Sequence, residues 1–224
     1  GRMGGGVRAA ELERYGIPVF IQPPDLTQLV RDYHIDICHV HRAGTYEPGS
    51  LPERYPGGPR VVETNVFHAL DEQEGDRIDC HCFVSESSRS TYFRRYGVQS
   101  GKRYEVLYNP VDFSEVSGGD KPFSRTIGRC SRPDDQKWHD VCLKSLPRIF
   151  RNVPEVRCLL QGATERVRST LTGLGLNGRV ELLEPSVHVK HFYRRLDIFT
   201  HGSRIGETFG CVIAEAMANG IPVV

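Results

Sequence analysis

Long apolar runs are missing from this sequence of 224 residues. No uninterrupted apolar segment approaches the roughly 18–20 residues that a helix needs to cross a bilayer, so we expect no transmembrane segment. The glycine-rich start at residues 1–6 is followed by no apolar stretch, which argues against a cleavable signal. These absences predict a cytoplasmic protein, with peripheral attachment to a membrane as the alternative.

An excess of charge of either sign is also missing, because 29 basic residues stand against 28 acidic ones. The chain therefore has no overall field that would attract nucleic acid or a lipid surface, and we expect no nucleic-acid partner. With 38% hydrophobic and 25% charged residues, the composition is that of an ordinary globular protein. Any anion would have to be bound by a local arrangement of side chains.

A disulfide framework is not indicated, although the chain has seven cysteines. Their number is odd and they are scattered through apolar stretches, which favours reduced, buried thiols. Cys80-His81-Cys82 resembles a metal-binding hook, but no second pair stands at a zinc-like spacing. We interpret these three residues as part of a strand and expect no metal site.

The sequence does contain an alternation of short apolar runs with amphipathic stretches. The apolar runs predict strands at residues 17–21, 35–40, 60–63, 78–84, 104–107, 124–128, 156–161, 180–183, 198–200 and 221–224. The amphipathic stretches predict helices at residues 8–15, 25–33, 85–95, 138–151, 165–174, 189–196 and 209–218. Strands that alternate with helices form parallel sheets, so the predicted fold class is α/β with two Rossmann-like domains.

A polar, glycine-rich segment at residues 112–122 interrupts this alternation and predicts a linker between two domains. We expect one domain over residues 1–115 and a second over residues 122–224. The last predicted strand begins only where the chain stops, so we expect the second sheet to be incomplete.

The segment at residues 206–224 combines an anion-binding helix start with two glutamates. Gly210 lets a ligand approach the backbone closely, and the free amides of the first helical turn attract an anion. Glu207 and Glu215 are eight positions apart, so their backbones lie about 12 Å apart along a helix. The two carboxyl groups of a glycoside hydrolase lie only about 5–9.5 Å apart. We therefore interpret the pair as two separate hydroxyl-binding carboxylates with an anion between them, which matches a nucleoside diphosphate sugar.

Glu-x7-Glu followed by Ala-Met-Ala-x-Gly-x-Pro-Val-Val resembles the signature of the retaining family 4 (group 1) glycosyltransferases, which have the GT-B fold. The resemblance implies that Glu207 holds the hydroxyls of the donor sugar and that Glu215 holds the ribose. It also implies that the helix start contacts the sugar and the diphosphate through Thr208, Phe209, Gly210 and Cys211. The family more often has Leu where Cys211 stands, which matters little if the backbone makes the contact.

A second segment is similar to the diphosphate clamp of the same family. Gly128 and Arg129 end a predicted strand, and Lys137 follows in the next turn. Parallel sheets bind ligands at the carboxyl ends of their strands. An Arg fork and a Lys charge at this place would neutralise a diphosphate and stabilise it as a leaving group. The alternative is two solvated charges beside a helix start.

The first half of the chain matches the acceptor domain of the family more loosely. The resemblance places the opening strand and the glycine-rich acceptor loop of the family before Gly1. The alternative is that residues 4–6 form that loop, although the helix that follows is then too short. Residues 104–112 are similar to the crossover between the two domains. His41 and Arg42 end a predicted strand and are candidates for acceptor contact. His68 is the nearest counterpart of a histidine that faces the donor sugar, but its spacing is displaced, and a lone histidine is more often a structural residue.

The predicted reaction is the transfer of a hexosyl unit from a nucleoside diphosphate sugar to an acceptor hydroxyl, with retention. Glu207, Arg129 and Lys137 are the predicted catalytic residues, and the acceptor is a glycan, a lipid-linked molecule or a small molecule. The resemblance implies no metal and no cofactor beyond the donor substrate. The alternatives are a GT-B-fold epimerase or phosphorylase, or a non-catalytic fragment that binds sugar nucleotides. Because both domains are expected to be incomplete, we predict that the chain by itself is a poor catalyst.

Overall fold

A computed structural model describes residues 6–116, 122–186 and 188–224 of the chain. The chain divides into two compact units, Gly1–Tyr108 and Asn109–Val224, and each is described by itself. Most of the predicted linker, residues 117–121, lies outside the described residues, as do two of the three residues considered for an acceptor loop, Gly4 and Gly5.

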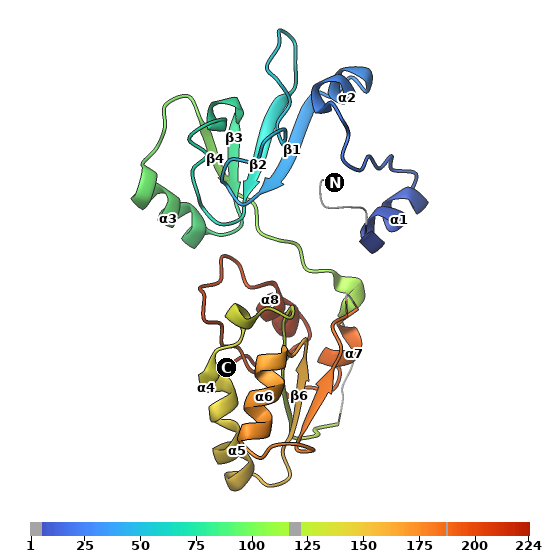
Figure 1. The fold of residues 1–224 in the computed structure, drawn as a ribbon, viewed down its shortest axis with the longest axis vertical. Helices are drawn as coiled ribbons and strands as arrows, with labels where there is room; N and C mark the ends of the chain where they lie inside the picture. Colours follow the sequence, from blue (N-terminus) through green and yellow to red (C-terminus); the bar gives the residue numbers. More distant parts are fainter. Residues whose placement is uncertain (1–5, 117–121, 187) are drawn as a thin grey trace. The chain divides into compact units, whose positions relative to one another are not determined.

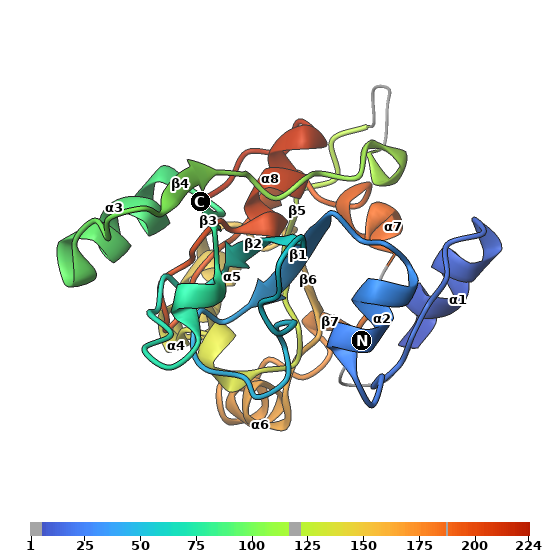
Figure 2. The same ribbon diagram turned by 90° about the horizontal axis from the view of Figure 1, so that it is seen from above.

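The first unit contains a parallel four-stranded sheet with the strand order β1-β2-β3-β4. Its strands are β1 (Ile37–Arg42), β2 (Arg60–Asn65), β3 (Cys80–Phe83) and β4 (Arg103–Val106). Its helices are α1 (Gly6–Arg14), α2 (Leu26–Asp32), the 3-10 helix η1 (Gly75–Arg77) and α3 (Glu86–Tyr96). Helix α3 lies beside β4, whereas α2 lies on the β1 side of the sheet (Figures 1 and 2).

Local sequence signals explain where the helices of the first unit begin. Asp25 caps α2 by accepting a hydrogen bond from the Gln28 amide, and Ser85 caps α3 in the same way. One predicted strand is wrong, because residues 17–21 have no regular structure. Ile17 and Ile21 are 47% and 49% exposed, so this run lacks the packing that a strand of apolar residues requires.

The second unit contains another parallel four-stranded sheet, with the strand order β7-β6-β5-β8. Its strands are β5 (Thr126–Cys130), β6 (Arg157–Gln161), β7 (Val180–Leu183) and β8 (Ile198–Phe199). Its helices are η2 (Phe113–Glu115), η3 (Asp135–Lys137), α4 (Asp140–Lys144), α5 (Leu146–Asn152), α6 (Glu165–Gly173), α7 (Lys190–Tyr193) and α8 (Cys211–Ala218).

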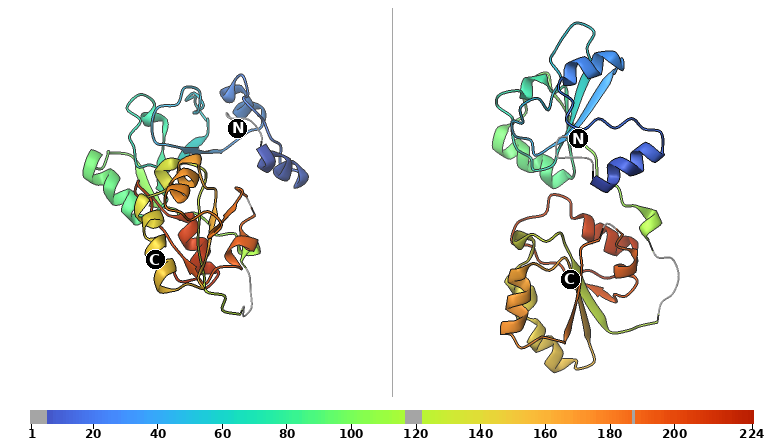
Figure 3. Two further views of the ribbon diagram at one scale, coloured as in Figure 1. Left: turned by 60° about the horizontal axis from the view of Figure 1, so that its bottom comes forward. Right: turned by 45° about the vertical axis from the view of Figure 1, so that its right-hand side comes forward.

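Helices cover both faces of the second sheet, and each face has its own apolar core. Trp138, Phe150 and Leu171 belong to a core that β5 and β6 share with α5 and α6. Phe192 and Ala216 belong to a second core, formed with α7 and α8. Figure 1 shows α4, α5 and α6 on one side of β6 and α7 on the other, and the right-hand view of Figure 3 shows the same layers. The predicted α/β class with two parallel sheets is therefore confirmed.

Several predicted elements of the second unit have different bounds in the structure, and three of the differences have a structural explanation or change the element. The predicted helix at residues 138–151 is two helices, because Pro147 has no N–H to continue the hydrogen-bond ladder. Pro147 lies instead in the first turn of α5, where a missing N–H is tolerated. The predicted helix at residues 209–218 begins two residues late, at Cys211, because Gly210 has a left-handed φ of 85°. The predicted last strand is a single parallel bridge between Phe199 and Val223.

Candidate functional site

Arg129 lies one residue before the end of strand β5, as a buried cation that is only partly paired. Its side chain is 2% exposed, and one guanidinium nitrogen donates a hydrogen bond to the carbonyl of Lys137. The guanidinium carbon lies 5.1 Å from the centre of the Trp138 ring. Its Nε and Nη1 groups have no hydrogen-bond partner among the described residues. Burial lowers the pKa of the guanidinium, and nearby Glu207 is among the groups that partly offset this effect.

Lys137 and Glu207 form an ion pair close to Arg129. The Lys137 Nζ atom lies 2.9 and 3.0 Å from the two carboxylate oxygens of Glu207. Both side chains are mostly buried, at 17% and 23% exposure. His201 Nε2 lies 3.4 Å from the same carboxylate, and burial and then Arg129 lower the pKa of this histidine despite Glu207. The structure thus brings together Arg129, Lys137 and Glu207, and adds His201, which the motif did not indicate.

Helix α8 begins directly after this cluster. Gly210 is its N-terminal cap and has a left-handed backbone conformation, with φ 85° and ψ 58°. A side chain at this position would be strained, and its Cβ atom would lie 3.1 Å from Ile213 Cδ1. Thr208 and Phe209 precede the cap and are half-buried, whereas Cys211 is exposed. The hydrogen bonds of the helix begin with the amides of Ile213 and Ala214, which donate to the Gly210 carbonyl. The amides before Ile213 therefore belong to the first turn of the helix, whose free N–H groups favour an anion in general.

Glu215 lines a separate pocket of about 390 Å³ at the carboxyl ends of β5 and β6. Its Oε2 atom accepts a hydrogen bond of 2.8 Å from the hydroxyl of Tyr193, at the end of α7. Gln161 lines the same pocket and donates from Nε2 to the Glu184 carbonyl at 3.0 Å. The sequence did not indicate a role for Tyr193, because a Phe-Tyr pair in an amphipathic helix predicts only buried side chains of the apolar core.

Gly128 has a packing role in the structure, and its predicted contact with the donor stays a prediction. Gly128 lies inside β5, where an added Cβ atom would lie 2.5 Å from Leu196 Cδ2 and 2.8 Å from the carbonyl oxygen of Leu159. Its own carbonyl accepts a hydrogen bond of 2.8 Å from the Thr200 amide. The absence of a side chain here allows the apolar layer to pack closely on the sheet, so Gly128 is a packing residue.

Arg42, a predicted acceptor contact, is buried in the first unit. Its side chain is 1% exposed, and its guanidinium lies 2.8 Å from Glu63 and 3.0 Å from Asp71. Glu63 in turn lies 2.8 Å from Nδ1 of the buried His81. Arg42 is therefore part of a buried ionic network of the first unit, and its contact with an acceptor stays a prediction.

The two acceptor-side histidines have different settings within the first unit. His41 is exposed on β1, and its ring centre lies 4.6 Å from that of His39. His68 is half-buried with a φ of 47°, which is uncommon for a residue other than glycine. Its Nδ1 atom is buried without a hydrogen-bond partner among the described residues. Burial, and then Arg95, lower the pKa of His68, which favours the neutral imidazole.

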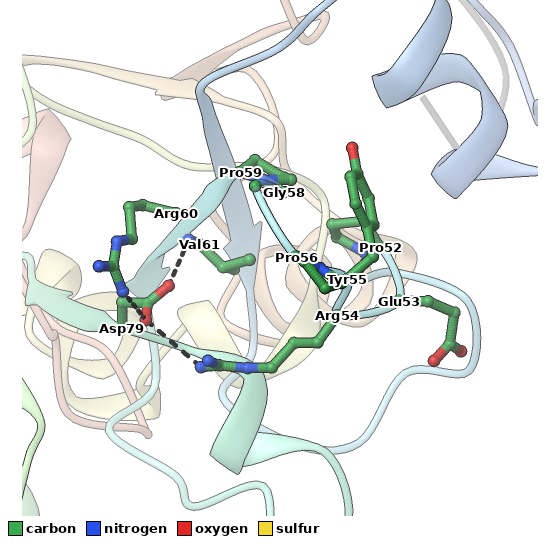
Figure 4. Close-up of a pocket in the computed structure, with 11 residues that line it drawn as sticks. Pro52, Glu53, Arg54, Tyr55, Pro56, Gly58, Pro59, Arg60, Val61 and Asp79 are labelled. Atoms are coloured by element: carbon green, nitrogen blue, oxygen red, sulfur yellow. Dashed lines mark hydrogen bonds and ion pairs between the residues drawn. The ribbon is translucent and has the colours of Figure 1, made fainter.

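A further pocket of about 500 Å³ lies in the first unit, where a proline-rich loop at residues 52–59 leads into β2. Arg54 and Arg60 both point to Asp79, at 3.3 and 3.2 Å from its carboxylate (Figure 4). Asp79 also accepts a hydrogen bond of 2.8 Å from the Val61 amide. Because both arginines already share a carboxylate, we assign no ligand to this pocket.

The part of the chain that the structure describes has neither a metal-binding cluster nor a membrane-spanning helix. Within it, no group of three or more His, Cys, Asp or Glu side chains is arranged to hold a metal ion. All seven cysteines fall within this part, and none of them forms a disulfide. Likewise, none of the helices described here has the length and apolar character that crossing a bilayer requires.

Comparison with protein families identifies the second unit. Residues 124–224 match the family model described as "Glycosyl transferases group 1". Among curated proteins, an exopolysaccharide phosphotransferase of Streptomyces coelicolor is 36% identical over 101 residues, which cover 41% of this chain and 10% of that protein. A D-inositol 3-phosphate glycosyltransferase of Segniliparus rotundus is 24% identical over 185 residues, which cover 74% of this chain and 40% of that protein. The chain therefore spans less than half the length of these relatives.

Comparison with solved structures covers almost the whole chain. HepE of Anabaena, solved in complex with UDP and glucose, superposes with a TM-score of 0.70 at 19% identity. The match covers 97% of this chain and 70% of HepE. At this identity the likeness shows the fold, and it extends over both units. The chain therefore has the GT-B fold, and its residues 124–224 match the family model of the group 1 glycosyl transferases, in agreement with the resemblance.

Proposed function

We propose that the chain is part of a retaining glycosyltransferase that moves a hexosyl unit from a nucleoside diphosphate sugar to an acceptor hydroxyl. The observation that carries the proposal is the incompletely paired cation in the second unit. A buried guanidinium with two unpartnered N–H groups is costly, and an anion bound beside it would offset that cost. Arg129 is such a group, and it lies one residue before the end of a parallel strand, at the edge where these sheets bind ligands.

The diphosphate is the anion that fits this place. Arg129 offers a fork of donors and Lys137 offers a compact charge within the same turn. The first amides of α8, after Gly210, supply further donors and the positive end of a helix dipole. In the reaction these groups would stabilise the nucleoside diphosphate as it leaves, so we assign Arg129 and Lys137 a catalytic role and invoke no metal or cofactor.

The two glutamates provide the two ends of the donor site. Glu207 lies beside Lys137, where it would accept hydrogen bonds from the hydroxyls of the donor sugar. Glu215 lines the pocket of about 390 Å³, a size suited to a small ligand, where it would hold the ribose. Thr208, Phe209 and Cys211 would add contacts around the helix start. The resemblance to retaining enzymes supports attack on the same face of the sugar, assisted by the donor phosphate.

The different roles proposed for Glu207 and Glu215 can be tested by replacing each of them. We expect Glu215→Ala to weaken the binding of a free nucleoside diphosphate and of its sugar conjugate alike, by about 1.5–3 kcal/mol, as for a lost hydrogen bond to a charged group. Glu207→Ala should leave the free nucleotide nearly unaffected and remove the extra affinity that the sugar contributes. Glu165→Ala, at an exposed position of α6, is the control. Calorimetry with UDP, GDP, ADP and their sugar conjugates measures both effects, and the reverse pattern would refute the assignment.

The outcome of the reaction needs a second assay. Incubation with labelled UDP- and GDP-sugars and a panel of glycan, lipid-linked and small acceptors should yield a glycosylated acceptor with a retained anomeric centre. An epimerised sugar nucleotide would show a sugar-nucleotide epimerase instead. Binding without turnover, in a chain that also fails when extended to the length of its relatives, would show a non-catalytic binding module.

A further inference from the structure

Tyr193 occupies a fixed position behind Glu215. Its side chain is 1% exposed, and its ring packs against Phe192 and Phe199 with centroid distances of 5.5 and 5.9 Å. Its hydroxyl oxygen lies 2.8 Å from Glu215 Oε2 and 3.1 Å from the Val212 carbonyl oxygen. It also lies 3.4 Å from Cys130 Sγ. The hydroxyl therefore contacts residues of β5, α7 and α8 at one point of the core. Figure 2 labels these three elements.

The proton of the Tyr193 hydroxyl can serve only one of these neighbours. A carboxylate and a carbonyl can only accept, and the thiol of Cys130 can either donate or accept. Glu215 is closer than Val212, and a charged acceptor forms the stronger bond, so the hydroxyl donates to Glu215. Burial raises the pKa of Cys130 to about 12 and raises that of Tyr193 as well, so both groups keep their protons at neutral pH. The thiol of Cys130 then donates to the hydroxyl oxygen, which completes a buried chain of donors.

This series of buried hydrogen bonds, from Cys130 through Tyr193 to Glu215, fixes the carboxylate of Glu215 at the wall of the pocket. A carboxylate on a flexible side chain samples several orientations, and ordering it on binding costs entropy. A hydrogen bond from a hydroxyl that the core already holds removes part of that freedom before a ligand arrives. We propose that Tyr193 is a positioning residue that acts through Glu215 and orients its carboxylate toward the vicinal hydroxyls of a ribose. The inference rests on the proposed function, in which Glu215 holds the ribose.

The test compares ribonucleoside diphosphates with their 2′-deoxy and 3′-deoxy analogues in calorimetric titrations of the whole chain. Pyrophosphate serves as a probe that has no ribose. In the chain with its natural sequence we expect a clear preference for the ribonucleotide. Tyr193→Phe removes a single oxygen atom, so it should reduce this preference by about tenfold, as for a hydrogen bond to a charged group. The affinity of this variant for pyrophosphate should not change. A general disturbance of the fold would instead lower both the ribose preference and the affinity for pyrophosphate.

A double variant tests whether Tyr193 acts through Glu215. Glu215→Gln should also reduce the ribose preference, and adding Tyr193→Phe should cause little further loss, because both changes remove one interaction. Phe192→Leu disturbs the same helix without touching the hydroxyl and should leave the preference intact. Cys130→Ala removes the donor to the hydroxyl and should lower the preference in the same direction by a smaller factor. This variant tests the inference even if Tyr193→Phe fails to fold.

The possible results separate the inference from the proposed function. Equal ribose preference in the unchanged chain and in Tyr193→Phe overturns the inference and leaves the proposed function standing. If Tyr193→Phe does not fold, an unchanged preference in Cys130→Ala overturns it in the same way. If the unchanged chain binds no nucleoside diphosphate, or binds ribose and deoxyribose forms equally, the assignment of Glu215 fails and the inference fails with it.

Discussion

Arg129 illustrates how a single residue can be unfavourable for folding and useful for binding. The folded chain buries its guanidinium against Trp138 while two of its N–H groups have no partner among the described residues. Buried cations without full compensation destabilise a fold, whereas an apolar side chain of similar length packs without this penalty. Functional sites often retain such unfavourable groups, because the ligand supplies the missing partner.

Arg129→Met should therefore raise the stability of the chain in the absence of ligand. We expect the free energy of unfolding to increase by about 1–4 kcal/mol, the range found when buried charges are replaced by apolar residues of similar size. Arg148→Met makes the same exchange at an exposed position of α5 and should change stability by less than about 0.5 kcal/mol. Urea unfolding, followed by the fluorescence of the single tryptophan, Trp138, measures both variants. A clear loss of stability in Arg129→Met would mean that its guanidinium is better compensated than its geometry indicates.

Helix α8 is the element in which backbone conformation and anion binding coincide. The helix begins only after Gly210, which has a left-handed φ of 85°. An L-residue in this conformation costs about 1–2 kcal/mol, because its Cβ atom approaches the following carbonyl oxygen.

Gly210→Ala should thus lower stability by about 1–2 kcal/mol and weaken nucleoside diphosphate binding as the helix start shifts. Gly206→Ala is a matched control four residues earlier, since an added Cβ atom there has no heavy atom within 4 Å. Thermal unfolding and nucleotide titration of the two variants give the comparison. Equal stability and equal nucleotide affinity of the two alanine variants would contradict the role assigned to Gly210.

The elements that the sequence predicted correctly are those set by local patterns. The strand at Val180–Leu183 matches its apolar run, and Asp25 and Ser85 cap their helices through their own side chains. The features that were missed depend on distant partners. Arg42 is buried because Glu63 and Asp71, 21 and 29 residues further along the chain, come to it in the fold. Tyr193 likewise has a role only because α7 packs next to α8, which no local pattern indicates.

At the scale of the whole molecule, the buried ionic network belongs to one unit and the single tryptophan to the other. Glu63→Gln removes the carboxylate that lies between Arg42 and His81, so it leaves a buried cation with less compensation. We expect the free energy of unfolding to fall by about 3–5 kcal/mol, as when one partner of a buried ion pair is removed. Glu72→Gln, at an exposed position one residue after Asp71, should have almost no effect.

Two optical signals show in which of the two units the loss of stability occurs. Trp138 fluorescence reports the second unit, whereas far-ultraviolet circular dichroism reports helices and strands of both. Glu63→Gln should move the dichroism transition to lower denaturant concentration and leave the midpoint of Trp138 fluorescence in place. A matching shift of both signals would show that the two units, Gly1–Tyr108 and Asn109–Val224, unfold together.

The central claim is that the second unit binds the diphosphate of a nucleotide sugar through Arg129. Isothermal calorimetry with UDP, GDP and ADP, applied to the unchanged chain, to Arg129→Met and to Arg148→Met, tests it most directly. The account predicts that at least one nucleotide binds the unchanged chain and Arg148→Met equally well. It predicts that Arg129→Met loses about 1.5–3 kcal/mol or more of that binding free energy, as for a lost bond between charged groups. Undiminished affinity in Arg129→Met would contradict the account.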